Sequence, residues 1–363
     1  MGSYLLAIAV LVLLGYGVQT ARWKNWSGYF LGKYRTFTLS AAAVFWVGIF
    51  LVLALFGGLR YYVGTDFESY YQIFLDICED WEDVRYNGTE RGFVWMNRLL
   101  SLFTEEPQWI IFLANAFVSF FCTWALIKES RFVPFSLYLV FTTLYYQSFN
   151  LVRQGMACAV VLLAFAYAKE RKWLRCYGLV LFAALFHRTA LLVLPVMVLV
   201  RFRYPHALYF VFFALASLGI FLKEQVIALL LRIYPSAVTA SEAYLYEEFS
   251  PVQTILCLIY VALCLLYEQK LLEKDRGNIV YLNMSILLLG MYAFFYWIPM
   301  WGRLQLYFIG LYSLIVPEVI ACEDSRLLRI LYYVVIWGIL LFFFIVPNWS
   351  SVGVWPYQTI FAR

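Results

Sequence analysis

Apolar stretches long enough to cross a membrane recur along the whole chain, separated by short charged segments. A helix needs roughly 20 apolar residues to span a bilayer. Hydrophobic residues make up 64% of the 363 residues, whereas an ordinary globular domain has roughly 45–50%. A soluble fold cannot bury that excess, so a soluble enzyme, a disordered tail and a coiled coil are excluded. The pattern predicts an all-α, polytopic integral membrane protein with about 12 transmembrane helices.

Two stretches decide how these spans are divided. The stretch 134–168 is too long for one helix, and the polar run from Gln147 to Gln154 predicts a hairpin within it. The stretch 177–200 has the length of one span, but His187 and Arg188 lie at its middle, where a charge costs about 2.5–3.5 kcal/mol. The predicted spans lie near 3–19, 37–57, 108–127, 134–149, 152–168, 175–187, 189–200, 207–222, 252–268, 279–297, 303–319 and 330–346.

The sidedness of the chain follows from its basic residues, because cytoplasmic loops carry an excess of Lys and Arg. If 177–200 forms two short helices with His187 and Arg188 at an outside turn, most of the 27 Lys and Arg residues fall on the cytoplasmic side. A single span inverts every later loop and leaves Arg188 in lipid. We therefore expect two short helices that line a water-accessible cavity, and some of the short helices to be re-entrant. Both termini are then expected on the outside.

We expect residues 1–363 to form a single transmembrane domain. Its two long outside loops, 58–107 and 223–251, each contain a stretch that predicts a short amphipathic helix, near 92–103 and 227–234.

Three arginines lie at positions where a charged side chain is energetically unfavourable, at the membrane ends of predicted spans. Arg153, Arg188 and Arg303 fall at the outer ends of predicted spans in three different hairpins. The planar guanidinium suits phosphate and carboxylate oxygens, so their recurrence predicts a site for a polyanion. For each arginine alone, an interhelical ion pair or a snorkelling head group is the alternative. The neighbouring spans offer no acid for such a pair, although acids of the first outside loop could fold back. Polar or small neighbours of the three arginines are Asn150, Gln154, His187, Thr189, Gly302 and Gln305.

The segment 60–71 directly follows the second predicted span. Gly64 permits a turn there, and Asp66 is held close to the membrane surface. A carboxylate at this place could deprotonate a hydroxyl or bind sugar hydroxyls, with nearby tyrosines as stacking faces. A solvated loop acid among interfacial tyrosines is the alternative. His187 is a second candidate for acid–base work because it lies beside an arginine at a break in the chain.

Other classes of site find no support. The acidic run 76–83 lacks ordered ligand spacing, so no metal site is predicted. A glycine-rich phosphate loop is absent from the sequence, and the basic residues form no run typical of nucleic-acid binding.

An ordered set of short motifs resembles a known family. The set comprises Gly64–Thr65–Asp66 with Tyr70, the sequence SFNLVRQGMA at 148–157, the basic turn 169–172, FHRTAL at 186–191 followed by Pro195, and Gly302–Arg303. In this order, over roughly 60–310, they resemble the EpsG-like branch of Wzy-type polysaccharide polymerases. Arg188 departs from the small or hydroxyl residue that the family usually has after the histidine.

The resemblance implies a glycosyltransferase of GT-C-like architecture in the bacterial cytoplasmic (inner) membrane, with its active site facing the periplasm. It would transfer a growing glycan from an undecaprenyl-diphosphate carrier to a lipid-linked oligosaccharide repeat unit without a cofactor. A chain-length regulator protein is a candidate partner. The catalytic candidates are Asp66, His187 and Arg153. The substrate-binding candidates are Arg60, Tyr70, Asn150, Gln154, Arg188, Arg303 and Gln305.

Two other functions remain open. An O-antigen ligase-like glycosyltransferase would need nearly the same chemistry and topology. A flippase for lipid-linked oligosaccharides would also need cationic groups in a cavity. It should, however, have polar or charged residues through the whole depth of its spans and internal repeats that relate its two halves.

Overall fold

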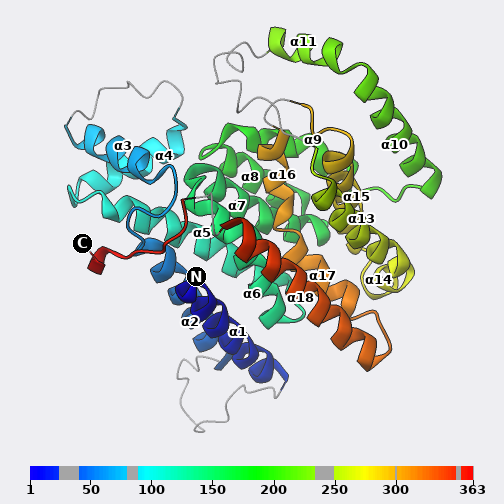
Figure 1. Ribbon diagram of the computed structural model, residues 1–363, viewed down its shortest axis with the longest axis horizontal. Helices are drawn as coiled ribbons and strands as arrows, with labels where there is room; N and C mark the ends of the chain where they lie inside the picture. Colours follow the sequence, from blue (N-terminus) through cyan, green and yellow to red (C-terminus); the bar gives the residue numbers. More distant parts are fainter. Residues whose placement is uncertain (24–40, 80–88, 234–248, 299–300, 349–352, 363) are drawn as a thin grey trace.

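The computed structural model describes residues 1–23, 41–79, 89–233, 249–298, 301–348 and 353–362. Every regular element in these ranges is a helix, arranged as shown in Figure 1. The longer helices are α1 (Gly2–Trp23), α2 (Ala41–Gly58), α5 (Gln108–Glu129), α7 (Val152–Lys169), α8 (Trp173–Ala184), α10 (His206–Phe221), α13 (Pro251–Leu266), α15 (Asn278–Ala293) and α18 (Arg326–Asn348). The shorter helices are α3 (Phe67–Glu79), α4 (Arg91–Ser101), α6 (Val133–Val140), α9 (Val193–Leu199), α11 (Lys223–Ile233), α14 (Glu268–Lys274), α16 (Trp301–Ile309) and α17 (Tyr312–Ile320). Single π or 3₁₀ turns are η1 (Phe141–Tyr145), η2 (Tyr146–Phe149), η3 (Arg188–Leu192) and η5 (Ile360–Ala362).

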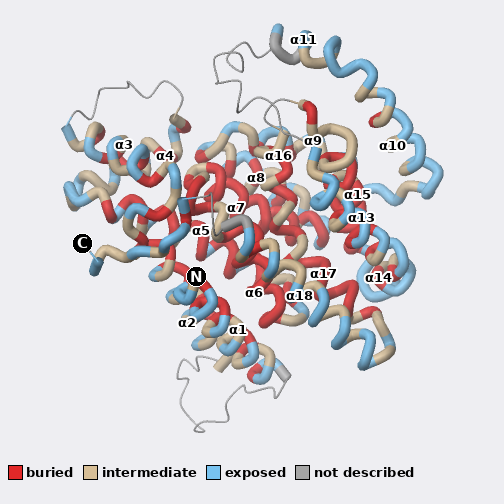
Figure 2. Tube along the Cα trace, viewed as in Figure 1, coloured by how far each residue is buried: buried red, intermediate tan, exposed pale blue. Residues whose placement is uncertain are grey.

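Helix α7 forms the centre of the bundle. Its most apolar stretch is 83% buried, whereas that of α18 is 6% buried. Figure 2 shows the buried residues gathered around α5, α6 and α7. Small residues let neighbouring backbones approach closely when hydrophobic attraction between helices is weak. Gly155 packs on Ser148, and Ala157 and Ala159 are fully buried on the same helix. The sequence near the start of α7 is therefore held on all sides.

The membrane character of the chain is confirmed by its helices. In the described residues, five helices are long and apolar enough to cross a membrane, or eight if each bent pair is one span. Helices α10 and α11 meet at 82°, α13 and α14 at 61°, and α16 and α17 at 48°. The shorter apolar helices are α8, the η3–α9 segment and α15. Each of the predicted spans coincides with a helix or a broken helix, but their number as membrane crossings stays a prediction.

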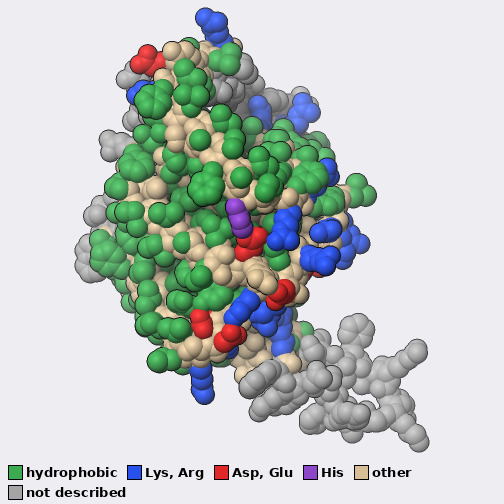
Figure 3. Space-filling view, turned by 90° about the vertical axis from the view of Figure 1, so that its right-hand side faces the viewer, with side chains coloured by type: hydrophobic (Ala, Val, Ile, Leu, Met, Phe, Trp, Pro, Cys, Tyr) green, Lys and Arg blue, Asp and Glu red, His purple; other side chains and the backbone are tan. Residues whose placement is uncertain are grey.

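Hydrophobic side chains also dominate the surface. Figure 3 shows the side that lies to the right in Figure 1, where green side chains cover most of the face. Lys, Arg and acidic side chains gather toward its lower and right-hand parts. This separation is typical of a surface that faces lipid over most of its area.

Both predicted helix breaks are present. Between α6 and α7 the chain passes through η1 and η2, so the helix ends before Asn150 and a new one starts at Val152. Between α8 and η3 the break is at His187, whose backbone is extended. Helices α3 and α4 occupy the loop 58–107 and α11 begins the loop 223–251. The sequence pattern did not single out α3.

The C-terminal segment 353–362 returns to the beginning of the loop 58–107. The Tyr61 N–H donates to the Gln358 carbonyl (3.0 Å), and the Gly64 N–H donates to the Gly353 carbonyl (2.9 Å). Near the other terminus, the Tyr4 hydroxyl donates to the Val354 carbonyl at 2.7 Å. The two termini therefore lie on the same side of the bundle, and their predicted location on the outer, non-cytoplasmic side of the membrane stays a prediction.

Candidate functional site

A carboxylate from the loop 58–107 joins two residues of the helix breaks. Glu90 precedes α4 and is buried, with 6% of its surface exposed. One carboxylate oxygen, Oε2, pairs with the Arg153 guanidinium at the start of α7. The other, Oε1, lies 3.1 Å from His187 Nδ1 and accepts from the Arg188 backbone N–H at 3.2 Å. We call Glu90, Arg153, His187 and Tyr70 the Glu90 cluster.

Gly92 explains why Glu90 reaches this place. The Gly92 N–H donates to the carbonyl of Leu185 at 2.8 Å, just before the break at His187. A Cβ atom built on Gly92 would lie 2.7 Å from that carbonyl oxygen. Only glycine lets the start of α4 approach the end of α8 so closely. This docking brings the Glu90 carboxylate beside the histidine.

The electrostatics of Glu90 follow from its neighbours. Burial alone would raise the pKa of this carboxyl group. The adjacent His187 side chain and the charge of Arg153 outweigh burial and lower the pKa of Glu90 from its ordinary 4.5 to about 2. Glu90 is therefore an anion at every physiological pH.

Tyr70 is the other partner of Arg153. It lies on α3, with 6% of its surface exposed, and the Arg153 guanidinium hydrogen-bonds its hydroxyl group. Burial raises the pKa of Tyr70, while the charge of Arg153 acts in the opposite direction. Arg153 thus connects α3 to α7. Asp66 lies one turn before Tyr70, is half-buried, and accepts from the Thr65 hydroxyl group at 3.4 Å.

The turn before Asp66 is fixed to the break between α6 and α7. The Thr65 N–H donates to the side-chain oxygen of Asn150 at 2.9 Å. Gly64 has φ +108°, and a Cβ atom there would lie 2.4 Å from the Phe149 carbonyl oxygen. Both the backbone conformation and the close approach require glycine. Two of the sequence motifs, GTD and SFNLVRQ, are therefore in direct contact.

Helix α16 joins the same region. The Gln154 amide donates to the backbone carbonyl of Arg303, and the hydroxyl groups of Thr189 and Tyr307 lie 3.0 Å apart. The Gln154 Oε1 atom is buried and has no hydrogen-bond partner among the described residues. The starts of α7, η3 and α16 thus converge, and the prediction that the three guanidinium groups form one site stays a prediction.

Not every predicted residue presents its side chain at this cluster. The Arg60 side chain is buried beneath it, donates to the Gly57 and Phe149 carbonyls at 3.0 and 3.4 Å, and lies 4.4 Å from the Phe149 ring centroid. Gln305 donates to the Met291 carbonyl at 3.3 Å. Arg188 contributes its backbone N–H, and its side chain is exposed.

Glu90 is the site residue that the sequence analysis missed. The expectation that the arginines have no acidic partner in neighbouring spans is correct for the spans, but an acid of the loop folds back to Arg153. The acids of this loop look alike in sequence, and the glycine that follows Glu90 by two positions is the signal that distinguishes it. In the described residues, no group of three or more His, Cys, Asp or Glu side chains could hold a metal ion.

Comparison with known proteins gives one match. The model of the EpsG family matches residues 43–359, which include every residue of the Glu90 cluster. No curated protein and no solved structure matches the chain.

Proposed function

The chain belongs to the EpsG family of Wzy-like polysaccharide polymerases, and we propose that it is a glycosyltransferase that lengthens a membrane-bound glycan. The donor in this proposal is a growing glycan on an undecaprenyl-diphosphate carrier, and the acceptor is a lipid-linked oligosaccharide repeat unit. The reaction takes place on the periplasmic face of the cytoplasmic membrane. The main structural support is the carboxylate of Glu90, which contacts His187 and Arg153 together.

His187 is the general base in this proposal. A carboxylate beside one imidazole nitrogen fixes the tautomer and leaves the other nitrogen to accept a proton. Here Glu90 Oε1 lies 3.1 Å from Nδ1, and both ring nitrogens are buried without an aligned hydrogen bond among the described residues, so Nε2 is left for the substrate hydroxyl group. Nε2 would take the proton from the acceptor hydroxyl group as its oxygen bonds to the anomeric carbon of the donor.

The arginines act on the leaving group. As the bond between the anomeric carbon and the diphosphate oxygen breaks, the electron pair stays on the diphosphate and its negative charge grows. Arg153 and Arg303 would stabilise this charge in a poorly hydrated site, with Arg188 assisting. Attack from the face opposite the diphosphate inverts the anomeric centre.

The remaining side chains would hold the sugars. Asp66 and Asn150 lie on the two sides of the Thr65 turn, and carboxylate and amide oxygens accept from sugar hydroxyl groups. The buried Gln154 Oε1 has an open acceptor site. Tyr70 holds the Arg153 guanidinium in position.

The chain carries a matched control for His187. His206, the other histidine, also faces a carboxylate, with Nε2 2.8 Å from Glu268 Oε2, but it is exposed at the start of α10. In proteoliposomes supplied with lipid-linked repeat units, His187→Ala should abolish long polymer and His206→Ala should not. Full-length polymer from His187→Ala would overturn the assignment of the base.

Lipid analysis of a null strain separates the polymerase from the two other functions. Loss of a polymerase leaves glycans one repeat unit long on the acceptor. Loss of a ligase leaves long chains on the carrier lipid, and loss of a flippase leaves single units in the cytoplasmic leaflet. Either of the last two results would contradict the proposal.

A further inference from the structure

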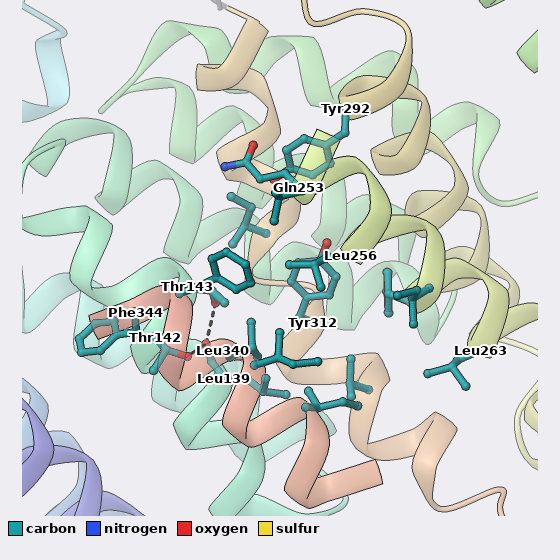
Figure 4. A pocket seen from close by; sticks show the side chains of 18 of the residues that line it. Leu139, Thr142, Thr143, Gln253, Leu256, Leu263, Tyr292, Tyr312, Leu340 and Phe344 are labelled. Atoms are coloured by element: carbon teal, nitrogen blue, oxygen red, sulfur yellow. Dashed lines mark hydrogen bonds between the residues drawn. The ribbon is translucent and has the colours of Figure 1, made fainter. Parts of the chain in front are cut away.

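A cavity of about 400 Å³ borders the α6–α7 break, where Thr143, Tyr146 and Gln147 line it. Residues of α6, η1, α13, α17 and α18 form its wall, as Figure 4 shows. Most of the surface of this wall is hydrocarbon, from side chains such as Leu139, Leu256, Leu263 and Leu340. The cavity is therefore suited to an apolar ligand rather than to a sugar.

Of the polar side chains that line the cavity, Thr142 and Thr143 donate their hydroxyl groups to backbone carbonyls of α6, whereas side-chain amides lie at one end. Gln253 and Tyr292 lie together at its upper end in Figure 4, whereas Leu139, Leu263 and Leu340 lie lower. Gln147 of η2 also lines it. A ligand that fills the cavity would thus have an apolar body and a polar end.

The polar end is near the Glu90 cluster. The Gln305 amide, near the start of α16, donates to the Met291 carbonyl at the end of α15. The Thr254 hydroxyl, at the start of α13, donates to the Tyr292 carbonyl at 3.3 Å. These contacts place the polar end of the cavity at the end of the bundle that carries Arg303.

Two elements run directly from the cavity to the predicted diphosphate site. On η2, Gln147 lines the cavity and its carbonyl accepts from the Asn150 N–H at 3.2 Å. On α16, Ile309 lines the cavity, and Arg303 lies about 9 Å farther along the helix axis at 1.5 Å per residue.

The cavity also borders a helix that is open to lipid. Helix α18 is the least buried of the five long apolar helices. It is tied to α13 and α14 at their far ends, where the Tyr267 and Tyr332 hydroxyl groups lie 3.3 Å apart and Lys270 pairs with Asp324 at 2.5 Å. Both α13 and α18 expose large apolar side chains, among them Ile255, Ile259 and Val335, so an apolar chain in the membrane can pack along them.

We propose that this cavity binds the isoprenoid chain of the lipid diphosphate substrate, next to the diphosphate. The inference rests on the proposed function, because it takes the substrate to be lipid-linked. An apolar cavity of about 150 Å³ holds one benzene ring, so this one has room for roughly two or three isoprene units. A phospholipid acyl chain is the competing occupant. Arg303, about 9 Å along α16 from Ile309, favours a lipid whose head group is a diphosphate.

A bulky side chain placed in the cavity tests this inference. Leu256 lines the cavity, whereas Leu258 lies on the opposite face of α13 and is 52% exposed. The matched variants are Leu256→Trp and Leu258→Trp. A second pair on α18 is Leu340→Trp, in the cavity, and Leu331→Trp, which is 50% exposed and outside it.

The first measurement is the KM of the full chain in nanodiscs for diphosphate-linked repeat units with a long isoprenoid carrier or with a short carrier, in which a methyl group replaces the isoprenoid chain. With the long carrier, Leu256→Trp and Leu340→Trp should raise KM about 10-fold, and their controls should match the wild type. With the short carrier, the KM of the two cavity variants should exceed that of the wild type by less than about 2-fold. An unchanged KM in both cavity variants, or the same rise with both carriers, would contradict the inference while leaving the polymerase proposal intact.

The second measurement needs no polymerase activity. A benzophenone-bearing isoprenyl diphosphate should label peptides of α13 or α18 in the wild type, and Leu256→Trp should lose this labelling. An excess of unlabelled isoprenyl diphosphate should compete, and phosphatidylglycerol should not. Labelling confined to other helices, or equal competition by phosphatidylglycerol, would overturn the inference. If the wild type lengthens no lipid-linked glycan, the polymerase proposal fails, and the labelling still reports on the cavity.

Discussion

The Oε1 atom of Glu90 lies 3.1 Å from the Nδ1 atom of His187, although the two residues are far apart in the sequence. The same oxygen accepts from the Arg188 backbone N–H, so the carboxylate is oriented at the turn where α8 ends. Its second oxygen pairs with Arg153. One loop residue therefore fixes both the histidine and the arginine that the proposed reaction uses.

Replacing Glu90 by glutamine should reduce polymer synthesis strongly. The amide cannot hold the imidazole and the guanidinium with the same charge, so the His187 tautomer and the Arg153 position are lost. We expect Glu90→Gln to lower the rate of chain extension by about 10²-fold, the low end of what a positioned base contributes. The control is Glu268→Gln, which alters the half-buried carboxylate beside the exposed His206. Equal rates in the two variants would contradict the role of Glu90.

The stability contributed by Glu90 should depend on pH. Because its pKa is about 2 in the folded chain and ordinarily 4.5, the contribution is complete above pH 4.5 and is lost as the pH falls toward 2. The melting temperature of the wild type in detergent should therefore exceed that of Glu90→Gln at pH 6, and the difference should narrow at pH 3. If the difference in melting temperature were the same at pH 6 and pH 3, the neighbours of Glu90 would not lower its pKa in the folded chain.

A methyl group at Gly92 should disturb the site from a distance. In Gly92→Ala the new Cβ must move the Leu185 carbonyl, which it would otherwise approach to 2.7 Å. The start of α4 then withdraws from α8 and takes Glu90 with it. We expect at least about 10-fold less polymer, a loss of about 1.4 kcal/mol in transition-state stabilisation. The control is Gly178→Ala on α8, where a Cβ meets nothing within 4 Å. If both variants synthesise polymer at the wild-type rate, the docking of Gly92 on Leu185 does not position Glu90 for the reaction.

Replacement by alanine should have different effects at Arg60 and at Arg303, two of the arginines predicted to bind substrate. Arg60 is fully buried and donates to backbone carbonyls, and hydrogen bonds to charged groups contribute about 1.5–3 kcal/mol each. Arg60→Ala should therefore lower the melting temperature by several degrees and reduce the folded yield. Arg303→Ala should leave the melting temperature nearly unchanged and raise KM for the lipid-linked unit. Melting curves and initial rates of both variants distinguish these outcomes, and the reverse pattern would contradict the assignment.

Much of the fold could be predicted from hydrophobicity and charge. The breaks at Asn150 and His187 follow from polar residues inside apolar stretches, because such residues are costly in lipid. The start of α16 lies beside the start of α7, where Gln154 donates to the Arg303 carbonyl, which is consistent with placing these residues at the same end of their spans. These features depend on local sequence and on the membrane alone.

The partner of Arg153 could not be predicted in the same way. Glu90 is one of several acids in its loop, and the docking of Gly92 on Leu185 selects it. Such docking is a long-range contact that no local pattern encodes. The placement of Arg60 is a similar case. Its position after α2 is the same for an arginine that faces a ligand and for one that caps the carbonyl of Gly57.

The hydrogen bond between Gly64 and Gly353 has a consequence for biosynthesis. The turn that presents Asp66 packs on the Phe149 carbonyl on one side and is hydrogen-bonded to Gly353 on another. A ribosome must therefore translate the chain as far as Gly353 before this turn acquires its final support. A chain interrupted during insertion would contain Arg153 and His187 but an incompletely supported acidic turn, so partial products would not extend glycans prematurely.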